Sequence, residues 1–198
     1  MNRYVSGFTC GLVLAAAPAF AQAPATMGLA DSMRQAYQGL KTNLTQAADK
    51  MPEADYMSKP STMPEVRGYA QLFGHVANAQ YGGCAAARGM ANPNQGNNLE
   101  TKTTKAETVK ALADSFAFCD PAFASLTDQS ALELVQQGQR QVARGGVLAG
   151  LLAHSNEMYG TAGVYLRAKN IVPPSTEGQG NRGGGAPAGG GRMGGRGN

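Results

Sequence analysis

The stretch from Gly146 to Arg167 limits the folds open to this chain more than any other, because its apolar residues recur with the period of an α-helix. Successive members of the stripe are three or four residues apart, which puts them on one helix face. The stripe consists of Val147, Leu151, His154, Met158, Ala162 and Tyr165. One member is a histidine, and the chain has only two. An imidazole on a core-facing stripe needs a polar partner, because burying it without a hydrogen bond is costly.

Two earlier segments have the same helical period. The first predicted helix covers about 27–50 and ends before Pro52. Its apolar seam is Met33, Tyr37, Leu40, Leu44, Ala47 and Met51. We expect the second helix to open near Pro64 and Glu65, since proline and an acidic residue both favour the first turn. It runs to about Met90 and carries the other histidine, His75, on a face shared with Leu72, Ala79 and Gly83.

A third helix follows the sequence Thr104-Lys-Ala-Glu107, which fits a capping box. We expect the dipeptide Asp120-Pro121 to break it. Residues 125–143 are rich in glutamine and weakly periodic, and they are compatible with a short helix. Together with the fourth helix, over about 144–169, these segments predict an all-α protein, a four-helix bundle.

The N-terminus has the composition of an export signal. Arg3 precedes a short apolar run from Phe8 to Ala17, and a small-x-small cleavage site lies before Gln22. This pattern predicts a signal peptide over residues 1–21. Because the apolar run is too short to span a bilayer, we expect no stable membrane insertion. The sequence therefore predicts an exported protein, either periplasmic or secreted.

The C-terminus and the body also differ in composition. Residues 178–198 contain 11 glycines, so we expect a disordered Gly/Arg tail, and the bundle then occupies residues 22–177. The net charge of +4 comes from the two ends, because the body between Gln22 and Glu177 has 13 Lys and Arg against 13 Asp and Glu. A neutral body lacks the electrostatic footprint of a nucleic-acid-binding protein, so we expect no nucleic-acid partner.

Cys84 and Cys119 lie near the C-terminal ends of the second and third predicted helices. In an exported protein such a pair more often forms a disulfide, with two unpaired buried cysteines as the alternative. A disulfide needs Cα atoms within about 7 Å of each other, so both helices would have to run in the same direction. The loop over 91–103 can span about 40 Å, enough for the return. A disulfide would therefore require a bundle that runs up, down, down, up.

The two histidines, on two different helices, are candidates for a shared metal site. Two ligands at i and i+4 of one helix, with one from a neighbour, form a three-ligand site with an open position, suited to Zn²⁺, Ni²⁺ or Fe²⁺. Four residues after His154 stands Met158, whose thioether suits Cu⁺ better than Zn²⁺. Glu157 is one residue off this geometry and is a weaker candidate. A functional metal site, a degenerate or structural histidine pair and a copper-preferring His–His–Met site all remain open.

Five motifs make the chain resemble the DinB superfamily. They are Met51-Pro-Glu-Ala-Asp-Tyr56, Arg67-Gly-Tyr-Ala-Gln-Leu-Phe-Gly-His75, His154-Ser-Asn-Glu-Met-Tyr-Gly160, Tyr165-Leu-Arg167 and Val172-Pro-Pro174. The resemblance, over about 27–175, implies a four-helix bundle with the helix order given above. It also implies a divalent metal held by one histidine of the second helix and two of the last. His75 and His154 match two of these positions, and Met158 occupies the third.

Two functions follow from this resemblance and from the residues themselves. Some members of the family are metal-dependent thiol S-transferases or isomerases, so the first is an exported metal-binding protein with a thiol-transferase-like activity on an unidentified small molecule. The second is a non-catalytic binding or structural module with a degenerate metal site. The sequence leaves open whether the protein is an enzyme and is compatible with a homodimer. Ser155 has no adjacent base for a hydrolase triad.

Overall fold

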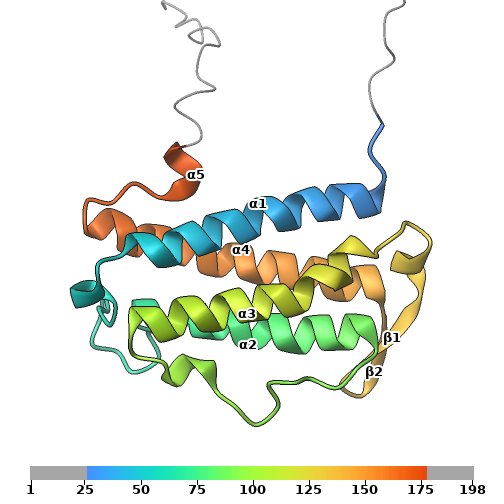
Figure 1. Ribbon diagram of the computed structural model, residues 1–198, viewed down its shortest axis with the longest axis horizontal. Coiled ribbons are helices and arrows are strands. Elements are labelled where there is room, and N and C mark those ends of the chain that lie inside the picture. The colour runs from blue at the N-terminus through green and yellow to red at the C-terminus, as the bar shows by residue number, and fades with distance from the viewer. Residues whose placement is uncertain (1–25, 178–198) are drawn as a thin grey trace, which may run out of the picture.

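A computed structural model of the chain describes residues 26–177, so the predicted signal peptide and Gly/Arg tail lie outside the described part. Four long α-helices lie side by side, and each packs on two others: α1 and α2 each contact both α3 and α4 (Figure 1). The elements are α1 (Leu29–Lys50), η1 (Glu53–Asp55), α2 (Tyr69–Arg88), η2 (Leu99–Thr101), α3 (Lys105–Ala124), η3 (Ser130–Leu132), β1 (Leu134–Gln137), β2 (Arg140–Ala143), α4 (Arg144–Ala168) and α5 (Pro174–Glu177), where η denotes a 3-10 helix. The predicted helical fold is confirmed, with a two-stranded hairpin added.

Helices α2 and α3 run in the same direction, opposite to α1 and α4 (Figure 1). The disulfide between Cys84 and Cys119 joins the parallel pair, with a Cα–Cα distance of 5.3 Å. Both cysteines are fully buried. The predicted disulfide is therefore present, and it holds α2 against α3 near their C-terminal ends.

The core lies between the four long helices. All six members of the predicted α1 seam, from Met33 to Met51, are buried. Within it Tyr37 stacks on Phe123 of α3, with ring centroids 4.0 Å apart and planes at 9°. Aromatic pairs stabilise a core beyond the area they bury. The 3.6-residue period thus identified the buried face of this helix correctly.

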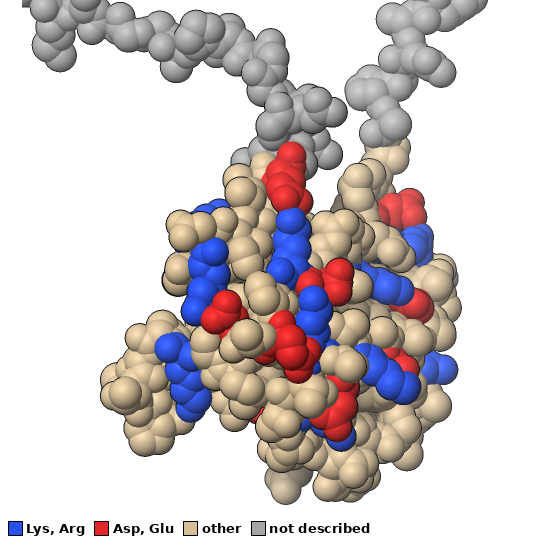
Figure 2. All heavy atoms as spheres, turned by 60° about the vertical axis from the view of Figure 1, so that its left-hand side comes forward, with Lys and Arg blue, Asp and Glu red and all other residues tan. Residues whose placement is uncertain are grey.

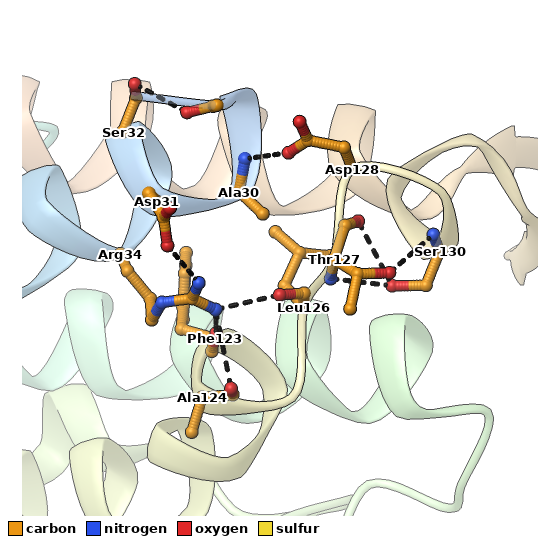
Figure 3. A network of polar contacts seen from close by, with 11 residues as sticks. Ala30, Asp31, Ser32, Arg34, Phe123, Ala124, Leu126, Thr127, Asp128 and Ser130 are labelled. Atoms are coloured by element: carbon orange, nitrogen blue, oxygen red, sulfur yellow. Dashed lines mark hydrogen bonds and ion pairs between the residues drawn. The ribbon is translucent and has the colours of Figure 1, made fainter. Parts of the chain in front are cut away.

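The start of α1 is capped by a residue from far along the chain (Figure 3). Gly28 stands at the N-cap and has no side chain to accept a hydrogen bond. Instead the carboxylate of Asp128 accepts one from the backbone N–H of Ala30, at 2.7 Å. Arg34 donates to the carbonyl oxygen of Leu126, at 2.7 Å, and ties the same turn of α1 to the segment after α3. A negative group at a helix N-terminus also interacts favourably with the helix dipole.

Two predicted helix boundaries are wrong. Helix α2 begins at Tyr69, not near Pro64, because the backbone N–H of Tyr69 bonds to Ser58 of the preceding loop and the side chain of Gln71 caps the turn. Helix α3 passes through Pro121 and ends at Ala124. Proline is tolerated there because it stands in the last turn, where its missing N–H removes a single intrahelical hydrogen bond.

Residues 125–143, undecided from the sequence, hold η3 and a β-hairpin. Strands β1 and β2 pair antiparallel, with Val135 opposite Val142 and Gln137 opposite Arg140. The two-residue turn contains Gly138 at φ +60°, a left-handed conformation that glycine adopts without steric cost. The buried side chain of Val135 attaches the hairpin to the bundle.

One face of the molecule carries charges of both signs side by side (Figure 2). On the face shown in Figure 2, Lys and Arg side chains are interspersed with Asp and Glu. Ion pairs such as Lys50–Glu177 and Lys169–Asp55, both at 2.6 Å, connect elements that are distant in sequence. None of the described helices combines the length and the apolarity that a membrane span requires.

Candidate functional site

His75 of α2 and His154 of α4 lie against each other. Their ring centroids are 4.9 Å apart and the ring planes meet at 69°. The structure therefore brings together the two histidines that the sequence singled out, although they lie 79 positions apart in the chain.

The predicted burial of both histidines is wrong, because both side chains are half-buried. In α4 the apolar stripe members Val147, Leu151 and Ala162 are buried, whereas His154 and Met158 lie at the edge of that face. Ser155, one residue further on, takes the buried position. The histidine pair thus sits where the α2–α4 contact opens to solvent, and a small solute can reach it.

A carboxylate that the sequence did not identify completes the site. Oε1 of Glu100, in η2, lies 2.7 Å from Nδ1 of His75, and Oε2 accepts a hydrogen bond from Nε of Arg67, at 2.8 Å. The exposed fractions of the His75, Glu100 and Arg67 side chains are 26%, 21% and 37%. Arg67, Glu100, His75 and His154 therefore form one continuous polar chain from the loop before α2 to α4.

The surroundings of two of these groups shift their pKa values. Partial burial raises the pKa of Glu100, but the hydrogen bonds and positive charges of Arg67 and His75 outweigh it, so the net pKa is lowered. Burial lowers the pKa of His154, and repulsion from His75 and Arg67 adds to this, while the nearby carboxylate of Glu157 opposes it. Neutral pH therefore leaves Glu100 ionised and favours a neutral His154 imidazole.

The position of Glu100 is set by close packing of η2 on α2. A Cβ at Gly74 would lie 2.6 Å from the carbonyl carbon of Leu99 and 2.8 Å from the Cα of Glu100, so only glycine allows this approach. One turn further, the side chain of Asn78 accepts a hydrogen bond from the backbone N–H of Leu99, at 3.1 Å. Asn98 in turn accepts one from the backbone N–H of Glu100, at 3.0 Å. The Gly74-His75 sequence thus places the histidine next to a helix position whose lack of a side chain lets the loop come this close.

The two weaker candidate ligands, Met158 and Glu157, differ in how far they are buried. Met158 is half-buried and packs against the core, and Glu157 is exposed. Within residues 26–177 no three His, Cys, Asp or Glu side chains are grouped so as to hold a metal ion. The sequence did not identify Glu100, because it stands in a loop without periodicity. A signal that could have pointed to it is that Arg67 and His75 each need an acceptor, and a carboxylate can serve both.

The donor set fits an open site with two protein ligands. The ring centroids are 4.9 Å apart, a separation that is ordinary for an edge-to-face contact of two rings and that also leaves the imidazoles close enough to share an ion with ligand distances of about 2.1 Å. Metal-binding histidines also commonly direct their second ring nitrogen to a carboxylate, as His75 does toward Glu100. Glu100 is engaged by His75 and Arg67, and the described residues offer no further His, Cys, Asp or Glu grouped with the two histidines as a third ligand.

A groove of about 290 Å³ leads along the α2–α4 contact to His154. Four of the eight residues that line it are glycine or alanine. The lining includes Ala79 and Gly83 of α2, Gly146, Gly150 and His154 of α4, and Gln137 of the hairpin. It contains no charged side chain, so it suits the uncharged part of a small molecule.

A largely helical bundle with a histidine pair between its second and last long helices places the chain in the class of small helical-bundle proteins. The sequence profile of the DinB superfamily matches residues 36–162, more than half of the chain, so the protein belongs to the DinB superfamily. A crystal structure described as a DinB-like protein from Bacillus cereus ATCC 10987 has a similar fold, with a TM-score of 0.59 and 14% sequence identity. That alignment covers 72% of this chain and 93% of the other. A comparison with curated proteins gives no match.

Proposed function

We propose that this protein binds a metal ion between α2 and α4 through His75 and His154, and presents the open coordination positions to a small molecule. The observation that carries the proposal is the contact of the two imidazoles, 4.9 Å apart at a solvent-facing edge. The family match adds support, since the DinB resemblance implies a metal at these two positions.

The chemistry of the ligands favours particular ions. Two neutral imidazoles with an open position suit Zn²⁺, Ni²⁺ or Fe²⁺, and participation of the Met158 thioether would favour Cu⁺. Such an ion would act as a Lewis acid toward a bound group, or lower the pKa of a bound thiol or water. The chain's own contribution is to hold the imidazoles and to offer the uncharged groove beside His154 to the small molecule. A thiol-transferase-like reaction is the activity that we propose for this arrangement.

Metal titration of the purified protein, with the oxidised disulfide intact, tests the metal site. We expect isothermal titration with Zn²⁺, Ni²⁺ and Cu⁺ to give one site per chain in the wild type and no saturable site in His75→Ala or His154→Ala. Met158→His adds a third imidazole four residues from His154 on the same helix face. Its Zn²⁺ affinity should rise by at least about tenfold, since even second-shell partners change metal affinity about 10–100-fold.

A non-catalytic module with a degenerate metal site is the second candidate. It is favoured by the absence, within residues 26–177, of a group of three His, Cys, Asp or Glu side chains. The same titrations decide between the two candidates. Wild-type protein that binds none of the three ions, while Met158→His binds Zn²⁺, would establish that the site has lost its metal through this one residue.

We also propose that the protein is exported and acts in an oxidising compartment. The fully buried Cys84–Cys119 disulfide supports this, because such bonds persist mainly outside the reducing cytosol. Mass spectrometry of the protein from fractionated cells tests it. A mature chain that begins at Gln22 in the periplasmic or secreted fraction is expected, and an intact N-terminus in the cytosolic fraction would refute it.

A further inference from the structure

We propose that Glu100 is the positioning residue of the site: it holds the imidazole proton of His75 on Nδ1, so that Nε2 keeps a free lone pair. The use of that lone pair for a metal rests on the proposed function. The placement of the proton does not, because it follows from the contacts of three side chains. Arg67 completes the arrangement by occupying the other carboxylate oxygen.

The contact between Glu100 and His75 determines which ring nitrogen carries the proton. An ionised carboxylate can only accept hydrogen bonds, and a neutral imidazole has one N–H. With Oε1 of Glu100 2.7 Å from Nδ1, that nitrogen must be the donor. Nε2 is then left as an acceptor, the form in which an imidazole binds a metal or takes up a proton.

Arg67 fixes the orientation of the carboxylate. Its Nε donates to Oε2 of Glu100 at 2.8 Å, so each carboxylate oxygen has its own partner. Its backbone oxygen accepts a hydrogen bond from the hydroxyl of Tyr165, at 2.6 Å, which attaches the loop before α2 to α4. Arg67 therefore occupies the carboxylate oxygen of Glu100 that His75 does not contact.

The backbone of η2 holds Glu100 at this place independently of its side chain. The hydrogen bonds from Leu99 and Glu100 to the side chains of Asn78 and Asn98 involve backbone N–H groups only. The close approach at Gly74 likewise involves only the backbone of η2. A substitution of the Glu100 side chain therefore leaves the loop in position and changes only what faces His75.

A purely structural ion pair and a positioning carboxylate make different predictions for Glu100→Gln. Glutamine keeps the shape but has one acceptor oxygen and one donor amide. Arg67 can only donate, so it takes the oxygen and turns the amide N–H toward His75. Nδ1 must then accept, and the proton moves to Nε2. The substitution should therefore exchange the two tautomers of His75, whereas a merely stabilising pair would only weaken the fold.

Long-range ¹H–¹⁵N spectra of the two imidazoles, recorded on the metal-free oxidised protein at pH 8, test this directly. The wild type should show His75 protonated on Nδ1, and Glu100→Gln should show it protonated on Nε2. Glu65→Gln is the matched control, because Glu65 is exposed and close to Arg67 in sequence, whereas the carboxylate bonded to His75 is that of Glu100. Its spectrum should equal that of the wild type.

Two further variants separate the positioning role from misfolding. Arg67→Met alone should keep the proton on Nδ1, since Glu100 still accepts it. Arg67→Met combined with Glu100→Gln frees the amide to rotate and offer its oxygen, so the Nδ1-protonated form should return in part. Persistence of Nδ1 protonation in Glu100→Gln, or a wild-type His75 without a preferred tautomer, would overturn the inference.

Zinc binding distinguishes this inference from the function on which its use depends. If the wild type binds Zn²⁺, Glu100→Gln should weaken the affinity about 10–100-fold, the usual effect of removing a partner that orients a ligand. If the wild type binds no metal but the tautomer exchanges as described, the proposed function fails and the positioning role of Glu100 stands. An unchanged zinc affinity in Glu100→Gln, with an unchanged tautomer, would refute the positioning role of Glu100 and leave the proposed metal site standing.

Discussion

Replacement of Gly74 by alanine should destabilise the protein, although the same change usually stabilises a helix. Alanine in a helix interior is favoured over glycine by about 0.5–1 kcal/mol. Here the new Cβ would lie 2.6 Å from the carbonyl carbon of Leu99, so η2 would have to retreat by about 1 Å to reach ordinary van der Waals contact. Overpacking of this kind costs about 1–3 kcal/mol, and the hydrogen bond from Leu99 to Asn78, worth about 1 kcal/mol, is lost as the loop moves.

The net expectation is a loss of about 1–3 kcal/mol in the free energy of unfolding, measured by urea denaturation monitored by circular dichroism. Gly82→Ala is the control, because it lies in the same helix and a Cβ there meets nothing within 4 Å. That variant should gain about 0.5–1 kcal/mol. A Gly74→Ala protein as stable as Gly82→Ala would refute the reasoning, because the close packing of η2 on α2 would then cost nothing to disturb.

Three other predictions concern the rest of the bundle. Asp128→Ala removes the cap from Ala30 and should cost about 1 kcal/mol in the same urea assay, whereas an unchanged midpoint would show that water replaces the carboxylate without loss. The double variant Cys84→Ala with Cys119→Ala should lose about 4 kcal/mol in non-reducing conditions, because the disulfide closes a loop of 35 residues in the unfolded chain; a loss below about 1 kcal/mol would contradict this. Burial raises the pKa of three fully buried tyrosines above the ordinary value near 10. The free energy of unfolding should therefore not depend on these groups below about pH 10. Above it the unfolded chain ionises first, and the free energy of unfolding should fall by about 1.4 kcal/mol per pH unit for each tyrosine. These are Tyr37, Tyr56 and Tyr69. Tyrosine absorbance that titrates near pH 10 while the fold persists would disprove the last prediction.

The parts of the structure that sequence reasoning predicted are those that depend on local spacing. The α1 seam is buried as expected because each of its members contacts the core through the same helix face. The disulfide followed from two cysteines near two helix ends. The histidine pair followed from the same period in α2 and α4, although both side chains lie at the edge of the buried face.

The parts that it missed depend on contacts between segments without a period. In α4, glycine and alanine are frequent on several faces, so apolar spacing alone could not decide between His154 and Ser155 for the buried position. Glu100 reaches His75 from a loop 25 residues away, and no local pattern announces that contact. The hairpin had a recognisable signal, Gly138-Gln139 between two short segments with valines at matching positions, which the glutamine-rich composition obscured.

The capping of α1 by Asp128 has a consequence for the order in which the chain can fold. A ribosome makes α1 first, but α1 packs on α3 and α4, and the residue that caps it is almost a hundred positions away. Isolated helices of this length are marginal in water, and contacts between distant segments form late because their loop-closure entropy must be overcome first. The first of these helices to be synthesised therefore gains its cap only after Asp128 has emerged, and its packing surface is complete only when α4 follows.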